Sequence, residues 1–125
     1  MAELKYKDIT EKIIGASFEV HSFLGNGFQE VIYQRALAWE MRQKGLAFDR
    51  EIEQEIYYKD LPKPIGKRRA DFVVEGKVLV ELKAVIQLED VHWAQVLNYL
   101  KAYRLEVGLL INFGSKSLTF KRLVL

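Results

Sequence analysis

Apolar residues change their spacing several times along the chain, and each change predicts a different element of secondary structure. They recur every three or four positions from Ile9 to Leu24, which predicts an amphipathic helix that ends at Gly25. Asp8 has the side chain of an N-cap for this helix. A second helix is predicted from about Phe28 to Lys44, with Asn26 placed to cap it. Two helices therefore open the chain.

Beyond the helices the period changes to two. In the stretch from Phe48 to Ile56, glutamates alternate with Ile and Gln, which predicts a strand with one solvated acidic face at an exposed or edge position. The segment from Lys59 to Lys67 contains both prolines of the chain and is predicted to be a basic loop. A hairpin of two apolar strands follows at residues 68–84.

The last third of the chain returns to helical spacing and then to strands. Residues 90–103 are predicted to form a helix, residues 107–113 a buried strand and residues 118–124 a final strand. The order is α-α-β-β-β-α-β-β, an α/β (α+β) fold in which helices flank a mixed sheet. The helix at 90–103 is placed to connect two parallel strands.

Composition limits the class of protein. The 125 residues suffice for one domain, which we expect to span residues 1–125. The absence of cysteine excludes disulfides and thiolate metal sites, and the charged N-terminus lacks the apolar core of a signal peptide. No apolar run is long enough to span a membrane, so we expect a cytoplasmic protein. Residues 63–125 hold 11 Lys and Arg against 6 Asp and Glu, which fits contact with an anionic polymer but also fits scattered surface lysines.

The hairpin raises a chemical question, because Asp71 and Glu81 lie within its apolar strands. A two-residue turn would put these acids on opposite faces, whereas a three-residue turn pairs Val74 with Val78 and sets Asp71 opposite Glu81. We predict the second register, because it gathers the apolar side chains on one face. That face comprises Phe72, Val74, Val78, Val80 and Leu82.

Two carboxylates opposite one another repel, so this register is costly unless a cation lies nearby. Mg²⁺, with Mn²⁺ as a substitute, suits two carboxylates together with water and phosphate oxygens. Lys83 follows Glu81 on the same strand face, about 7 Å further along, and could hold or activate an attacking water. Alternatively, Asp71, Glu81 and Lys83 belong to a group of surface ion pairs on the solvent-exposed face of a half-exposed sheet.

A motif in the second helix favours the catalytic reading. The stretch Gly27-Phe28-Gln29-Glu30-Val31-Ile32-Tyr33 resembles the motif of the GxxExxY proteins, and Asp71 with Glu81-Leu82-Lys83 resembles the signature of the PD-(D/E)XK nuclease superfamily. The resemblance covers nearly the whole chain and implies a restriction-endonuclease-like core. Ala70 departs from it, because a proline stands there in the signature.

The resemblance also implies roles for individual residues. Glu30, Asp71 and Glu81 would be the metal-site acids, the backbone carbonyl of Leu82 a further metal ligand and Lys83 the catalytic lysine. From the helical phase of its neighbours, Glu30 is expected to point inward.

Other polar residues could support this site. Gln95 and Tyr99 resemble a Gln-x-x-x-Tyr motif of some superfamily members and share one helical face, so they could line the same cleft or be ordinary boundary residues. Lys67, Arg68 and Arg69, with Lys63 in the loop, could bind phosphates or form a solvated loop. The remaining candidates are expected to be structural: His21 and His92 as boundary residues, and Trp39, Trp93 and the tyrosines as mostly core.

The leading hypothesis is a small Mg²⁺-dependent nuclease acting on nucleic acid, with DNA favoured over RNA. Replacement of Asp71, Glu81 or Lys83 by Ala should then abolish cleavage and leave the fold intact. The alternatives are a non-catalytic module that binds nucleic acid or an unknown protein partner, and a structural ion-pair cluster without metal. A strand at residues 118–124 could also pair with a second copy and form a homodimer.

Overall fold

The computed structural model describes residues 4–125, so the first three residues of the charged N-terminal stretch lie outside the described residues. The order of elements is α-α-β-β-β-α-β-β, as predicted. The helices are α1 (Lys7–Leu24), α2 (Glu30–Gln43) and α3 (Asp90–Tyr103). The strands are β1 (Phe48–Ile56), β2 (Gly66–Val74), β3 (Val78–Lys83), β4 (Val107–Asn112) and β5 (Thr119–Val124).

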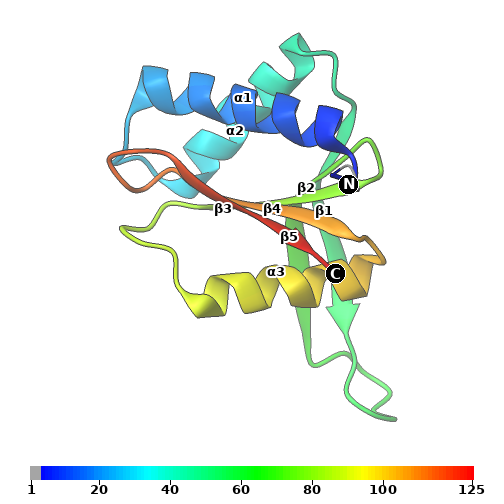
Figure 1. Ribbon diagram of the computed structural model, residues 1–125. Helices are drawn as coiled ribbons and strands as arrows, with labels where there is room; N and C mark the ends of the chain where they lie inside the picture. Colours follow the sequence, from blue (N-terminus) through cyan, green and yellow to red (C-terminus); the bar gives the residue numbers. More distant parts are fainter. Residues whose placement is uncertain (1–3) are drawn as a thin grey trace.

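The strands form one five-stranded mixed sheet in the order β1-β2-β3-β4-β5. Neighbouring strands are antiparallel except β3 and β4, which are parallel and are connected through α3 as predicted. Figure 1 shows α1 and α2 on one face of the sheet and α3 on the other. The strand β1 lies at one edge, which confirms the edge position predicted from its exposed glutamates.

Each face of the sheet packs against its helices through a separate apolar cluster. The larger cluster fills the space between the sheet and the α1–α2 pair, and includes the predicted apolar face of the hairpin. The smaller cluster lies under α3 and comprises Ala70, Leu79, Val96, Leu100 and Leu110. The two strands of the hairpin contribute to both clusters, because both faces of the sheet are covered.

The ends of the first two helices differ from the predicted ones. Helix α1 begins at Lys7, so Asp8 lies inside its first turn and is not the cap. Helix α2 begins at Glu30 after Gln29, and Asn26 lies too far upstream to cap it. The prediction for Gly25 is confirmed, since its N–H donates to the carbonyl of His21 at 2.8 Å. Asp8 still favours the helix from inside the first turn, through the helix dipole.

Strands β1 and β2 form a ribbon that passes from one layer to the other. Phe48 packs edge-to-face on Phe72, with ring centroids 5.3 Å apart, in the cluster under α1 and α2. Further along the ribbon, Ala70 belongs to the cluster under α3. On β1, Arg50 pairs with Phe72 and Ile52 pairs with Ala70, and Glu51 lies between them. Glu51 has a left-handed φ of 51°, and the continued register sets it opposite Asp71. Asp71 therefore lies where the ribbon changes faces.

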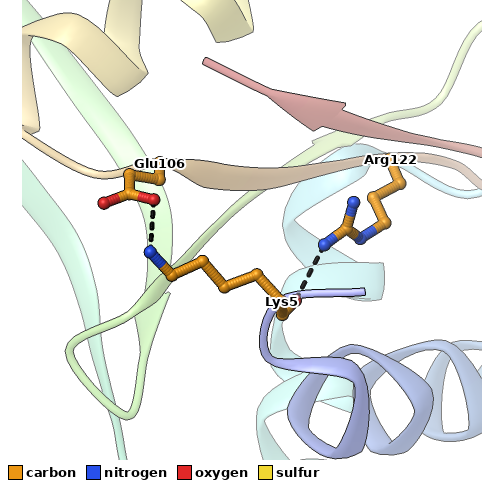
Figure 2. Close-up of polar contacts among 3 residues, drawn as sticks. All are labelled: Lys5, Glu106 and Arg122. Atoms are coloured by element: carbon orange, nitrogen blue, oxygen red, sulfur yellow. Dashed lines mark hydrogen bonds and ion pairs between the residues drawn. The ribbon is translucent and has the colours of Figure 1, made fainter. Parts of the chain in front are cut away.

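The N-terminal segment contacts the part of the sheet formed by β4 and β5. The ammonium of Lys5 donates to the carboxylate of Glu106 at 2.5 Å, and Arg122 of β5 donates to the Lys5 carbonyl at 2.7 Å (Figure 2). Both contacts are exposed, so they fix the position of the segment more than they add stability. Within the described part of the chain, no helix has the length and apolar character that a membrane crossing requires.

The aromatic residues divide into a buried and an exposed set. Tyr33 is fully buried and stacks on Phe113, with ring centroids 4.8 Å apart. In contrast, Trp39 is 57% exposed, Tyr57 is 56% exposed and Tyr58 is 53% exposed. The prediction that Trp39 and the tyrosines are mostly core is therefore wrong for these three.

Candidate functional site

The hairpin of β2 and β3 has the predicted three-residue turn. Val74 pairs with Val78, and the N–H of Lys77 donates to the carbonyl of Val74 at 3.0 Å. Glu75 and Gly76 occupy the left-handed region, with φ of 54° and 65°. The paired register continues only to Phe72 and Val80, and the next position sets Asp71 opposite Glu81. The predicted register is confirmed, and the two strands separate at the acids.

At this separation the two carboxylates replace the missing ladder hydrogen bonds. The N–H of Asp71 donates to Oε1 of Glu81 at 2.9 Å. In return, the N–H of Leu82 donates to Oδ2 of Asp71 at 2.8 Å. Each acid thus binds the backbone of the opposite strand, which places the two side chains next to each other. Glu81 is only 5% exposed, whereas Asp71 is half-buried and borders a surface hollow.

The environment favours the protonated form of both acids. Burial, reinforced by the charge of Asp71, raises the pKa of Glu81 to about 8. Burial also raises the pKa of Asp71, although its hydrogen bonds from Leu82 and Gln34 and the nearby Lys83 act in the opposite direction. Two adjacent carboxylates that both ionise would repel in a site of low polarity. The site therefore favours a bound cation or a retained proton.

Lys83 supplies one positive charge beside these acids. Its charge lowers the pKa of Glu30, Asp71 and Glu81, although in each case other causes are larger. Among residues 4–125, no carboxylate lies within 4.0 Å of the Lys83 ammonium. Its backbone is fixed, because the N–H of Phe113 donates to the Lys83 carbonyl at 2.8 Å. Lys83 is half-buried, and its side chain is thus held near the acids while it stays free to contact a ligand.

Glu30 and Asp71 line the same surface hollow. The hollow has a volume of about 200 Å³, and its walls include Glu30, Gln34, Arg69 and Asp71. Partial burial and then the charge of Asp71 raise the pKa of Glu30. The side chain is exposed to solvent, yet it lines the same hollow as Asp71, so the inward direction predicted for Glu30 stays a prediction. As the first residue of α2, Glu30 precedes the part of the helix that packs on the sheet.

The donor set suits a hard divalent cation, because carboxylate oxygens are the ligands that Mg²⁺ and Mn²⁺ prefer. Burial and then the charge of Asp71 raise the pKa of Glu81, and a cation held by both acids would offset that charge. Across residues 4–125, however, no three acidic or histidine side chains come together as a ready metal site. The chain therefore offers Asp71 and Glu81 as a pair, and Glu30 is not part of the same tight cluster.

Comparison with known proteins places this geometry in a family. The model of the PD-(D/E)XK nuclease superfamily matches residues 7–123, which is nearly the whole chain. The chain belongs to the PD-(D/E)XK nuclease superfamily. The hairpin brings together the three residues that resemble the superfamily signature, Asp71, Glu81 and Lys83.

One solved structure supports the fold assignment. A crystal structure of a protein named SSO0001 aligns with 96% of this chain at a TM-score of 0.58 and 16% sequence identity. The chain spans 59% of the length of that protein. At this identity the likeness concerns the fold, which both chains share despite very different sequences. No curated protein matches the chain.

Two residues that sequence patterns did not single out organise the superfamily acids. Gln34, only 5% exposed, donates from Nε2 to Oδ1 of Asp71 at 2.9 Å. Its Oε1 accepts from Nη2 of Arg50 at 3.0 Å. The Gln34 amide thus connects α2 and β1 to the acid on β2. One sequence signal existed: Gln34 follows Glu30 by four residues, which puts both on the same face of α2.

The two residues that resemble the Gln-x-x-x-Tyr motif lie away from these contacts. Tyr99 packs edge-to-face on Tyr103, with centroids 6.1 Å apart, in the cluster under α3. Within residues 4–125, neither Gln95 nor Tyr99 hydrogen-bonds to Asp71 or Glu81. Tyr103 lies closer to the acids, since its hydroxyl accepts the N–H of Ala70, the neighbour of Asp71, at 3.3 Å. Burial raises the pKa of Tyr103, and the charge of Glu81 adds to this effect. A supporting role for Gln95 and Tyr99 stays a prediction.

The basic residues of β2 have three different environments. The ammonium of Lys67 lies 3.9 Å from a carboxylate oxygen of Glu53. Arg68 donates to the side-chain oxygen of Asn98 on α3 at 3.0 Å. Arg69 lines the hollow that contains Asp71, and its charge lowers the pKa of Asp71. Of the three predicted phosphate-binding residues, Arg69 therefore lies nearest to the acids.

Proposed function

We propose that this chain is a divalent-metal-dependent nuclease of the GxxExxY type that hydrolyses phosphodiester bonds, with DNA as the favoured substrate. The observation that carries the proposal is the reciprocal bonding of Asp71 and Glu81 across the separated strands, with Lys83 beside them. Membership of the nuclease superfamily supports a nucleic-acid substrate. The Gly27-to-Tyr33 stretch supports the finer assignment to the GxxExxY proteins.

In this proposal Asp71 and Glu81 hold Mg²⁺ or Mn²⁺, with the backbone carbonyl of Leu82 as a further ligand. The bound cation would supply electrostatic stabilisation of the charge that develops on the phosphate. Glu30, which lines the same hollow as Asp71, orients water or substrate. Gln34 fixes the carboxylate plane of Asp71 through the bond to Oδ1, which leaves that acid little freedom to rotate.

Lys83 provides the chain's own positive charge at the reaction. Its ammonium donates hydrogen bonds to the attacking water or to a non-bridging phosphate oxygen, and it stabilises the added negative charge. Arg69, on the wall of the hollow, binds the neighbouring phosphate. The hollow is small, which suits one phosphate and its water molecules better than a whole nucleotide.

One observation favours a second candidate, a non-catalytic cluster that stabilises the sheet. Both oxygens of Asp71 already accept hydrogen bonds, from Gln34 and from the N–H of Leu82. Oε1 of Glu81 accepts from the N–H of Asp71. These bonds would satisfy the pair without a metal if one acid kept its proton. A chain with such a cluster could still bind nucleic acid or a protein through its other surfaces.

The two candidates differ in metal binding and in cleavage. Calorimetry with Mn²⁺ and Mg²⁺ should show one binding site in the wild type and weaker binding in Asp71→Asn, which keeps the size of the side chain. Labelled single-stranded and double-stranded DNA should be cleaved by the wild type with either metal. Lys83→Ala should lower the cleavage rate by about 10²-fold or more while it retains metal binding, because loss of one transition-state donor has effects of this size.

The matched control is Lys12→Ala, which removes an exposed lysine of α1 and should cleave like the wild type. Cleavage by Lys83→Ala at the wild-type rate would refute the assigned role of Lys83. A folded wild type without metal affinity or cleavage would instead support the non-catalytic cluster.

A further inference from the structure

The outer end of the β1–β2 ribbon extends beyond the rest of the sheet. Pairing of β2 with β3 stops at Phe72, whereas pairing of β2 with β1 continues to Gly66 opposite Ile56. Figure 1 shows the loop at the end of this ribbon projecting past α3, away from the other elements. We name residues 57–67 the arm. Its position gives the arm solvent on several sides and leaves its side chains free for a partner.

The arm presents aromatic rings in defined positions. Tyr57 is 56% exposed, yet its hydroxyl donates to a carboxylate oxygen of Glu55 at 2.7 Å. Tyr58 is 53% exposed, and the Lys59 ammonium lies 5.2 Å from the centroid of its ring. Exposed aromatic rings with restrained orientation can bind a planar ligand with little loss of side-chain freedom. Bases of nucleic acid are such ligands.

The arm also carries unpaired positive charge. Lys67 has a partner in Glu53, but within residues 4–125 no carboxylate lies within 4.0 Å of the ammonium groups of Lys59 and Lys63. Asp60 is the one acidic residue among residues 57–67. Lysines beside exposed aromatic rings combine phosphate attraction with base stacking, as in proteins that bind single strands.

The arm is continuous with the candidate site. Strand β2 leads from Gly66 through Arg69 to Asp71, and these last two residues line the same hollow. Five residues of extended chain cover about 17 Å, which is the length of a few nucleotides. A strand bound to the arm would therefore pass Arg69 before it reaches the acids. This continuity favours nucleic acid over a protein as the occupant of the arm.

We infer that the arm binds an unpaired nucleic-acid strand through Tyr57, Tyr58, Lys59 and Lys63, and that it delivers this strand to the Asp71–Glu81 site. The inference rests on the proposed function and makes its substrate class more specific. Stacking on the tyrosines requires exposed base faces, which a duplex hides inside its own stack. The substrate is therefore a single strand or a structure with an unpaired segment.

Binding without cleavage tests the inference. Anisotropy of a labelled oligothymidylate of about 20 nucleotides, and of a duplex of equal length, is measured in EDTA for wild type and variants. The wild type should bind the single strand more tightly than the duplex. The double variant Tyr57→Ala/Tyr58→Ala should bind it at least about 30-fold more weakly, since each of the two stacked bases contributes about 1 kcal/mol or more.

Two further variants complete the test. Lys59→Gln/Lys63→Gln should reduce the slope of log affinity against log salt by about 1.4, or about 0.7 for each phosphate contact of a single strand. Trp39→Ala removes an aromatic residue of similar exposure from α2, which lies on the other face of the sheet, and should bind like the wild type. Circular dichroism confirms that each variant is folded.

The other outcomes overturn the inference. Equal affinity of the tyrosine variant and the wild type would show that the arm does not contact the strand. Tighter binding of the duplex would assign the wrong substrate class, and absence of binding to both probes would leave a protein partner as the occupant of the arm. Hydrolysis of bis(p-nitrophenyl) phosphate by wild type and Lys83→Ala, with metal, tests the proposed function separately, because this small diester cannot span the arm and the acids.

Discussion

Replacement of Glu81 by glutamine should stabilise the metal-free protein at alkaline pH. The folded protein retains a proton on Glu81 up to a pKa of about 8, against an ordinary value of 4.5. Between these two values the unfolded chain has released the proton and the folded chain has not. In this window folding requires the uptake of a proton, which becomes less favourable as the pH rises. The free energy of unfolding therefore falls with rising pH. The glutamine side chain of the variant carries no charge at any pH, so this loss would disappear.

The size of the effect follows from the shift. A single group with this pKa difference lowers the free energy of unfolding by up to ~1.4 kcal/mol per pH unit, or ~5 kcal/mol over the whole window. Whole domains are stable by about 5–15 kcal/mol, so even half of this effect is large. Charge on Asp71 contributes to the shift, and the two acids therefore titrate together and not one by one.

Urea denaturation in EDTA, at several pH values from about 5 to about 8.5, measures how the free energy of unfolding depends on pH. The wild type should lose a few kcal/mol of stability across the range. Glu81→Gln should have a flatter profile and should exceed the wild type at the alkaline end, because the amide keeps an oxygen that accepts the N–H of Asp71. Glu19→Gln, which changes an exposed acid of α1, is the matched control and should follow the wild type.

A wild-type stability that stays constant or rises between about pH 5 and pH 8.5 would refute the reasoning, as would identical profiles for wild type and Glu81→Gln. Addition of Mn²⁺ at alkaline pH gives an independent check. The cation should restore stability to the wild type and should do little for Glu81→Gln, because binding to the folded state alone shifts the equilibrium toward it.

Three other substitutions test the supporting structure. Gln34→Leu removes the donor to Oδ1 of Asp71, so the free energy of unfolding measured in urea should fall by about 1–3 kcal/mol and Mn²⁺ binding measured by calorimetry should weaken. Unchanged values for both would show that the contact is unimportant. Gly114→Ala would place a Cβ 2.3 Å from the backbone nitrogen of Val85, so it should destabilise by about 2 kcal/mol or more, and an unchanged urea midpoint would contradict this. Tyr103→Phe removes the hydroxyl that joins α3 to both strands of the ribbon and should speed amide exchange there by about tenfold, whereas wild-type exchange would exclude this role.

Local patterns in the sequence predicted the elements and the hairpin well. The helix at residues 90–103 has the predicted bounds, and the pairing of Val74 with Val78 follows the predicted register. Both rest on interactions between residues close in sequence, where helical spacing and turn length leave few alternatives. The start of β2 was less well predicted. Gly66 and Lys67 continue the ribbon because β1 offers a partner that the basic composition of the segment does not reveal.

Contacts between distant elements were not predictable. Arg50 and Asp71 meet through Gln34 because β1, β2 and α2 are neighbours, and no local pattern encodes that arrangement. The same holds for Asn112, a fully buried residue whose side-chain oxygen accepts the N–H groups of Val85 and Gly114. Polar residues in apolar segments were the available signal, since a buried polar group requires a partner.

The hydrogen bonds of the site change how its acids should be tested. The sequence alone suggested that Asp71→Ala would abolish cleavage and leave the fold intact. In the structure this change would remove the acceptor of the Leu82 N–H and of the Gln34 amide, both in a part-buried region. Donors left without a partner there cost stability, so lost activity in Asp71→Ala could reflect a loosened hairpin. Asp71→Asn keeps an oxygen for one donor, and Lys83→Ala disturbs neither bond. Cleavage that survives Asp71→Asn but fails in Asp71→Ala would therefore indicate a structural role for this carboxylate, whereas loss in both variants with an unchanged urea midpoint in Asp71→Asn would indicate chemistry.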